Sequence, residues 1–217
     1  MRRAKFSLHV GVVALTCWGM TWNAAGEEPA GTLIRQGDTI NLFKAWPEIA
    51  KAPQSELATI EMWIKPDAAA LARPRSFLIT LSNQAGSDVA GLSLTIKQSA
   101  VAANVFATSL QSPAVLAHGT WTHIALTVNS RTINKQARLW INGELAADEL
   151  VLEPWPRSFE VASMLSDKWQ QGRHFTGELG DVRISKTVRY NAAFNPPPRL
   201  TQDEHTVLLL AGQQLPL

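Results

Sequence analysis

Apolar and polar residues alternate along two neighbouring parts of the chain, residues 120–128 and 136–142. Alternation with a period of two predicts β-strands that bury one face. The second run ends in the pair Asn142-Gly143, which tolerates the positive φ angles of a type I′ turn and so predicts a hairpin into the residues that follow. The whole block therefore predicts three consecutive antiparallel strands.

The same alternation recurs along most of the chain. It is clearest in residues 58–65, where the even-numbered side chains are apolar and Pro66, which has no N–H for a β-ladder, is expected to end the strand. Further strands are expected at residues 32–36, 39–43, 76–81, 92–97, 101–107, 145–152, 160–165, 174–185 and 206–210. No segment keeps a helical period, so we expect an all-β fold, a two-sheet antiparallel sandwich or jelly roll.

The first 26 residues have the composition of a secretory signal peptide. Three basic residues near the start precede a mostly apolar run at 6–18, and Ala24-x-Gly26 suits cleavage after Gly26. An apolar run of about 13 residues is too short to span a bilayer, which needs roughly 20, so no transmembrane span is expected in the mature form. The sequence thus predicts a signal peptide over 1–26, a single domain over 27–217, and a secreted protein, extracellular or periplasmic.

Removing this segment changes both cysteine content and charge. Cys17 is the only cysteine, and a lipid anchor on it remains an alternative to cleavage near Gly26, although Thr16 before it fits such a site poorly. Cleavage after Gly26 leaves no thiol for a disulfide or for thiol catalysis. It also leaves 17 basic against 18 acidic residues, and without a basic excess we expect no nucleic-acid partner.

Four motifs resemble a known family. ATIEMWIKP, GTWTHIALTV, ARLWINGEL and FTGELGDVRIS, in this order, resemble the LamG-like jelly-roll domain of the concanavalin A-like lectin/glucanase superfamily. The resemblance covers about residues 31–210 and implies two antiparallel sheets packed face to face. The superfamily's β-glucan hydrolases carry two catalytic Glu with an Asp between them on one strand, whereas Glu178-Leu179-Gly180-Asp181 has no second Glu. We therefore expect no catalytic residues and a protein that is not an enzyme.

The positions opposite the expected core residues supply a candidate ligand face. If the strands are neighbours, one face of a sheet collects aromatic rings and hydrogen-bonding groups that suit a sugar: Glu61, Trp63, His123, Arg138, Trp140 and Arg183. The alternative is a structural network under the loops, with Glu61 paired to Arg138 or Arg183.

Loops supply further candidates. Trp155, which lies between two prolines in the sequence, is a candidate stacking platform, and so are Trp46 and Trp169. Each of these rings could instead close an open end of the sandwich. The resemblance also implies a structural calcium ion as an alternative to no cofactor. Oxygen-bearing side chains suit calcium, and the candidates for it are Asp38 and Asp181, with Asp167 and Asn142 as further options.

Three functions remain open on these grounds. The first is a secreted non-catalytic binding module for carbohydrates, with a glycan as partner. The second is an extracellular interaction or structural domain with a cell-surface or extracellular protein as partner, which predicts buried tryptophans. The third is a polysaccharide hydrolase or lyase with an unfamiliar catalytic pair, and it depends on the versatility of the superfamily rather than on any residue.

Overall fold

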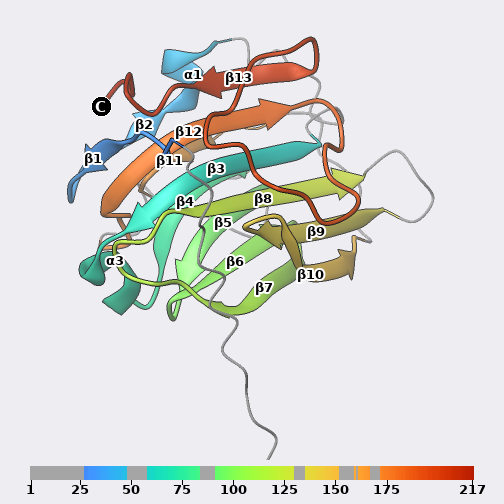
Figure 1. Ribbon diagram of the computed structural model, residues 1–217, viewed down its shortest axis with the longest axis horizontal. Coiled ribbons are helices and arrows are strands. Elements are labelled where there is room, and N and C mark those ends of the chain that lie inside the picture. Colours follow the sequence, from blue (N-terminus) through green and yellow to red (C-terminus); the bar gives the residue numbers. More distant parts are fainter. Residues whose placement is uncertain are drawn as a thin grey trace, which may run out of the picture.

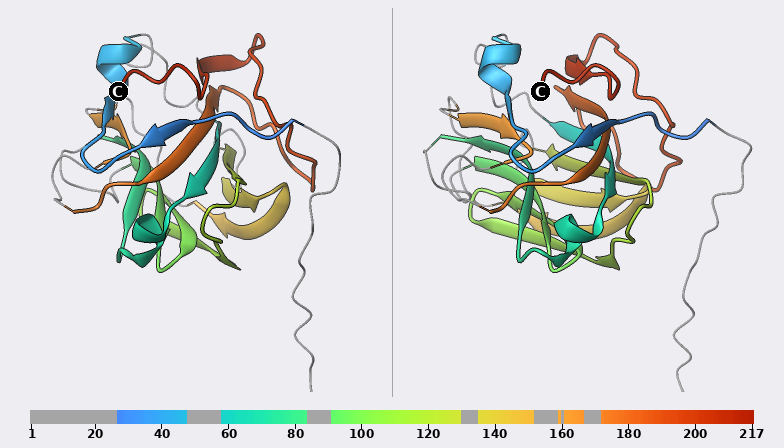
Figure 2. Two further views of the ribbon diagram at one scale, coloured as in Figure 1. Left: turned by 60° about the vertical axis from the view of Figure 1, so that its left-hand side comes forward. Right: turned by 90° about the vertical axis from the view of Figure 1, so that its left-hand side faces the viewer.

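A computed structural model describes residues 27–47, 58–83, 91–129, 135–151, 159, 161–166 and 172–217. In these parts of the chain, thirteen strands form two antiparallel sheets that lie face to face (Figures 1 and 2). This confirms the expected all-β jelly-roll sandwich. Within the same residues, no helix has the length and apolar character needed to cross a membrane.

The first sheet has seven strands in the order β1-β12-β3-β8-β9-β10, with β13 also paired to β12. The strands are β1 (Thr32–Ile34), β12 (Gly177–Ser185), β3 (Thr59–Pro66), β8 (Thr122–Asn129), β9 (Gln136–Ile141), β10 (Glu144–Leu150) and β13 (Thr206–Leu210). Consecutive pairing of β8, β9 and β10 confirms the three antiparallel strands that the alternating block predicted.

The second sheet has six strands in the order β2-β11-β4-β5-β6-β7. The strands are β2 (Ile40–Asn41), β11 (Val161–Met164), β4 (Ser76–Ser82), β5 (Gly91–Lys97), β6 (Ala100–Val105) and β7 (Thr108–Val115). Strand β7 was not expected, because Pro113 interrupts its pattern. Its place at the edge of the sheet accommodates a residue without an N–H.

Two short helices correct the sequence-based expectation. The strand predicted at 39–43 ends early in α1 (Leu42–Ala45), where Asn41 accepts the N–H of Lys44 at 3.1 Å as an N-cap. Helix α3 (Ala68–Ala72) begins in the same way after Asp67. Both helices are too short to show a helical period in the sequence.

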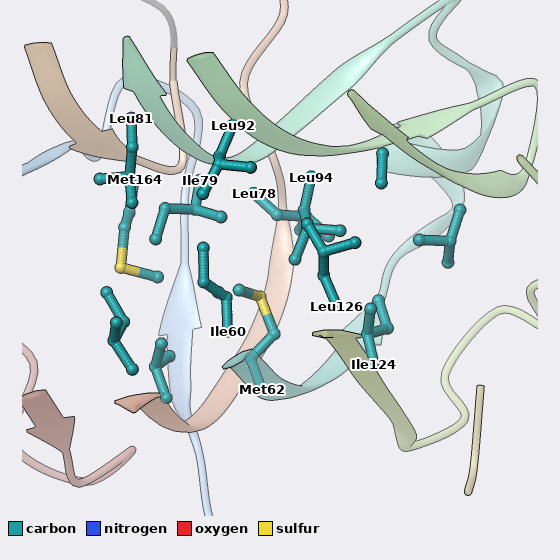
Figure 3. Close-up of a cluster of buried hydrophobic side chains, with 14 of the residues drawn as sticks. Ile60, Met62, Leu78, Ile79, Leu81, Leu92, Leu94, Ile124, Leu126 and Met164 are labelled. Atoms are coloured by element: carbon teal, nitrogen blue, oxygen red, sulfur yellow. The ribbon is translucent and has the colours of Figure 1, made fainter. Parts of the chain in front are cut away.

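The core lies between the two sheets (Figure 3). Ile60 and Met62 of β3 are paired with Leu126 and Ile124 of β8, and these side chains face apolar residues of β4 and β5 such as Leu94. Alternate positions of each strand therefore point inward, as the period of two predicted. The remaining positions point away from the other sheet, and we call this side of each sheet its outer face.

The Asn142-Gly143 turn joins β9 to β10 as predicted. Asn142 has a φ of 50° and Gly143 a φ of 83°, the positive values of a type I′ hairpin. Gly143 has a second reason to lack a side chain, since a Cβ there would collide with the carbonyl of Phe194. The Phe194 N–H donates to the Gly143 carbonyl at 3.0 Å.

Phe194 belongs to a long connection between β12 and β13 that crosses the outer face of the seven-stranded sheet (Figure 1). We call residues 186–200 the covering segment. Side chains of the sheet hold it: Trp63 Nε1 donates to the Pro197 carbonyl at 3.0 Å, and Asp181 accepts from Arg199 Nε at 2.9 Å. The part of this outer face around Trp63 and Asp181 is therefore covered by the chain itself, whereas Lys65 and Arg138 remain partly exposed.

Candidate functional site

Glu61 on β3 is the centre of a charged cluster beneath the covering segment. Its side chain is fully buried, and Arg183 on β12 donates from Nε to Glu61 Oε1 at 2.8 Å. Tyr190 of the covering segment donates its hydroxyl to Oε2 at 2.7 Å, and His123 on β8 places Nε2 at 3.3 Å from the same oxygen. The pairing of β3 with both β12 and β8 brings these groups together.

The carboxyl of Glu61 is kept in its charged form by these neighbours. Burial would raise its pKa, because a carboxylate loses water, but the interactions with His123 and Arg183 and the Tyr190 hydrogen bond outweigh burial, and the pKa is lowered. Burial and the charge of Glu61 together raise the pKa of the Tyr190 hydroxyl. Glu61 is therefore an ionised hydrogen-bond acceptor that ties three strands to the covering segment.

Aromatic rings close this cluster. The His123 ring lies 5.1 Å from Trp63 and 5.8 Å from Phe194, between ring centroids. Phe194 stacks on Tyr190 with 3.5 Å between centroids and 3° between planes. On the neighbouring strand, Trp140 Nε1 donates to the Thr127 hydroxyl at 3.0 Å, which leaves its indole no free polar group.

The structure thus brings five of the expected ligand residues together, but it buries them. At most 7% of any of these side chains is exposed: Glu61, Trp63, His123, Trp140 and Arg183. The sixth, Arg138, pairs instead with Asp148 on β10 at 3.1 Å. The pairing of Glu61 with Arg183 agrees with the alternative prediction, in which these residues form a structural network under the loops.

The expected loop tryptophans have different outcomes. Trp46, just after α1, is half-buried and packs against the core. Trp155 and Trp169 lie outside the described residues.

The expected calcium ligands do not fit such a site. Both oxygens of buried Asp181 accept N–H groups, Oδ1 from Gly212 and Oδ2 from Leu200 and Arg199. Asp38 accepts the Arg35 N–H at 2.7 Å in the turn between β1 and β2. Among the residues described, no three His, Cys, Asp or Glu side chains are grouped so that they could hold a metal ion, and Asp167 lies outside them.

The outer face of the six-stranded sheet carries a different site. Facing residues on five adjacent strands form what we call the polar row: Ser163 on β11, Thr80 on β4, Ser93 on β5, Asn104 on β6 and Ser109 on β7. Their sequence neighbours Leu92, Leu94 and Ala103 point into the core. Strand register alone therefore aligns hydroxyl and amide groups across the sheet.

The polar row is buried in the middle and opens at one end. Ser93 is 1% exposed and Thr80 7%, whereas Asn104 is half-buried and Ser109 exposed. The Ser109 hydroxyl donates to Asn104 Oδ1 at 2.8 Å, which fixes the orientation of the amide. Among the five residues of the row, solvent therefore reaches Asn104 and Ser109, at the β7 end.

Two hydroxyls at the centre of the row have no partner among the described residues. Thr80 Oγ1 and Ser93 Oγ are both buried and without a hydrogen bond, and the two residues face each other across β4 and β5. Three buried ring nitrogens among the described residues also have no hydrogen bond: Nδ1 of His174, which bridges to Phe77 on β4, and both ring nitrogens of His123 beneath the covering segment. Leaving a buried hydroxyl unpaired costs about 1–3 kcal/mol, so a hydrogen-bond partner at either of these hydroxyls would be favourable.

Sequence reasoning missed this row, although its pattern is present. Ser93 and Thr95 alternate with leucine and isoleucine in GLSLTIK, which predicts that they lie opposite the core. Nothing in the pattern shows that Thr80 and Asn104 are the neighbours of Ser93, because that depends on the order and register of three strands. Serine and threonine in a strand are also weaker indicators of a binding site than tryptophan or glutamate.

The family follows from a direct comparison of sequences. The family model Laminin_G_3, described as the concanavalin A-like lectin/glucanases superfamily, matches residues 44–193, most of the chain. The chain belongs to this superfamily. The resemblance of the four motifs is thereby confirmed. Among curated proteins, none matches the sequence.

Solved structures share the fold. CBM40 of the Ruminococcus gnavus IT-sialidase is similar with a TM-score of 0.58 and 20% identity over 76% of this chain and 93% of that one. A proposed carbohydrate-binding protein from Bacteroides ovatus has a TM-score of 0.54 and 16% identity over 74% of this chain. The leech intramolecular trans-sialidase has a TM-score of 0.54 and 19% identity over 74% of this chain.

The lengths of these proteins differ. The match spans about half (46%) of the Bacteroides ovatus protein and about a quarter (26%) of the leech enzyme, but nearly all of CBM40. At sequence identities of 16%, 19% and 20%, the similarity shows a shared fold alone.

Proposed function

We propose that this chain is a secreted, non-catalytic module that binds a glycan at the polar row. Proteins of the same fold support the class of ligand, since CBM40 has been solved with α2,3 and with α2,6 sialyllactose bound. The site is supported by this chain's own residues. The covering segment lies over Glu61 and Trp63 on the seven-stranded sheet, whereas the polar row of the six-stranded sheet is exposed at its β7 end, at Ser109.

The unpaired hydroxyls of Thr80 and Ser93 carry the proposal. A serine or threonine hydroxyl both donates and accepts, and so does each hydroxyl of a sugar. A sugar that enters the row supplies the missing partners without any charged group. Asn104, held by Ser109, adds an amide with donors and an acceptor at the open end of the row.

A non-catalytic role is supported by the state of Glu61. A retaining glycosidase needs two carboxyl groups about 5–5.5 Å apart, one of them protonated as a general acid. Glu61 has a lowered pKa, and both of its oxygens accept hydrogen bonds from its own chain. Its closest charged neighbours are Arg183 and Arg189 rather than a second carboxylate.

Glycan binding is tested with the purified protein on a glycan array and in polysaccharide pull-down. We expect retention of at least one glycan and a loss of at least tenfold in affinity in the double variant Thr80→Val/Ser93→Ala. Thr122→Val is the matched control, because it removes a buried threonine hydroxyl from the other sheet. Retention of no glycan, or equal binding by the double variant, overturns the proposal.

A protein partner is the second candidate, and the edge formed by β7 and β10 favours it. Thr108 on β7 donates to the Leu150 carbonyl on β10 at 3.3 Å, and apolar side chains along these strands are exposed: Val115 by 72%, Leu150 by 57% and Leu145 by 48%. Burial of Trp63 and Trp140 also agrees with this candidate. A purified partner whose binding is lost in Val115→Lys/Leu150→Lys, but kept in the Thr80→Val/Ser93→Ala variant, would favour it over glycan binding.

A further inference from the structure

We infer that the polar row is selective for a neutral glycan, recognised through neighbouring hydroxyls and without a calcium ion. The inference rests on the proposed function and names the chemistry of its ligand. It departs from the sialyllactose-bound CBM40 structures, because sialic acid carries a carboxylate. Three features of the row support it.

The first feature is charge. The six strands of this sheet contain a single charged residue, Lys97, at the end of β5. It lies four residues from Ser93, about 13 Å along an extended strand. Arg75 lies 6.0 Å from the ring of Phe77, five residues and about 16 Å along the chain from Thr80. A carboxylate at the centre of the row would therefore lose water without gaining a cation among the described residues.

The second feature is the spacing of the two unpaired hydroxyls. Thr80 and Ser93 face each other on antiparallel strands, where Cβ atoms are about 4.5–5.5 Å apart. Two donor–acceptor groups at this spacing suit two adjacent hydroxyls of one sugar ring. The amide of Asn104, one strand further, reaches a third polar group on the same or the next ring.

The third feature is the kind of oxygen that the row offers. Calcium prefers carboxylate and carbonyl ligands and usually several of them. The row has no carboxylate, and the nearby hydroxyls and single amide provide too little charge to displace the water around a divalent cation. We therefore expect these side chains to contact a sugar directly rather than through a calcium ion.

The test compares matched neutral and acidic glycans with and without a chelator. Lactose and α2,3 sialyllactose share a core, and the array is extended to neutral polysaccharides, each measured in calcium and in EDTA. We expect retention of neutral glycans, unchanged within twofold by EDTA and lost in Thr80→Val/Ser93→Ala. We also expect at least tenfold weaker binding of an acidic glycan than of its neutral counterpart.

The variant Lys97→Gln separates charge from hydroxyl recognition. We expect its affinity to equal that of the unaltered protein. A tenfold preference for sialyllactose, a loss of binding in EDTA, or a tenfold loss in Lys97→Gln overturns this inference. If glycan binding in that case still depends on Thr80 and Ser93, the proposed function stands and only this inference fails. Retention of no glycan overturns both the inference and the proposed function.

Discussion

Replacing Thr80 by valine should make the free protein more stable while it weakens the binding site. Valine keeps the branched shape of threonine and exchanges the hydroxyl for a methyl group. Because Thr80 Oγ1 is buried and unpaired, the exchange removes a desolvation penalty of about 1–3 kcal/mol. For a chain of this size, this corresponds to a rise in Tm of about 2–4 °C for each kcal/mol.

The comparison variant is Thr127→Val in the other sheet. Thr127 is as buried as Thr80, but its hydroxyl accepts the Trp140 indole N–H at 3.0 Å. The same chemical change there leaves an N–H unpaired and should lower the free energy of unfolding by about 1–3 kcal/mol. Opposite signs for two threonine-to-valine changes identify the Thr80 hydroxyl as the unpaired one.

Thermal and urea denaturation, both monitored by tryptophan fluorescence, measure the Tm and the free energy of unfolding of the two variants, with and without a retained glycan. A glycan that binds only the folded protein should raise the Tm of the unaltered protein more than that of the Thr80 variant. If Thr80→Val loses as much stability as Thr127→Val, its hydroxyl has a partner in the free protein. That result would refute the reasoning that selected the polar row.

Four further predictions concern the stability of the fold and the export of the protein. Glu61→Gln should lower the free energy of unfolding by about 3–5 kcal/mol, because it leaves the Arg183 charge buried without its partner; a fully stable variant would contradict the network. Because the pKa of Glu61 is lowered, its ionised form stabilises the fold above pH 4.5, the usual pKa of the group. This stabilisation should be lost as the pH falls through the lower pKa of the folded protein. Acid-denaturation curves of Glu61→Gln should not show that loss. Gly143→Ala should cost more than about 1 kcal/mol, through positive φ and collision with Phe194, and chemical denaturation that shows no change would refute this. Expression with and without residues 1–26, followed by N-terminal sequencing of exported protein, should show export only with the segment and a mature chain that begins at Glu27.

Much of the strand pattern could be predicted from local sequence. Alternation placed Ile60 and Met62 inside and Glu61 and Trp63 opposite them, and the structure agrees. The Asn142-Gly143 turn was equally local, because only the φ preferences of two residues decide it. Strand β7 was missed where Pro113 broke the pattern, since the edge position that tolerates it is a property of the sheet.

The sequence by itself determined the two-sheet fold, the family and the inward side of each strand, because these depend on periodicity and short motifs. Only the tertiary structure decided what lies on each outer face. Contacts between residues far apart in the chain place Tyr190 and Phe194 over Glu61 and Trp63, so the most conspicuous side chains are buried. The register of β4 with β5 sets two inconspicuous hydroxyls side by side without a partner, and no local pattern of residues encodes that pairing.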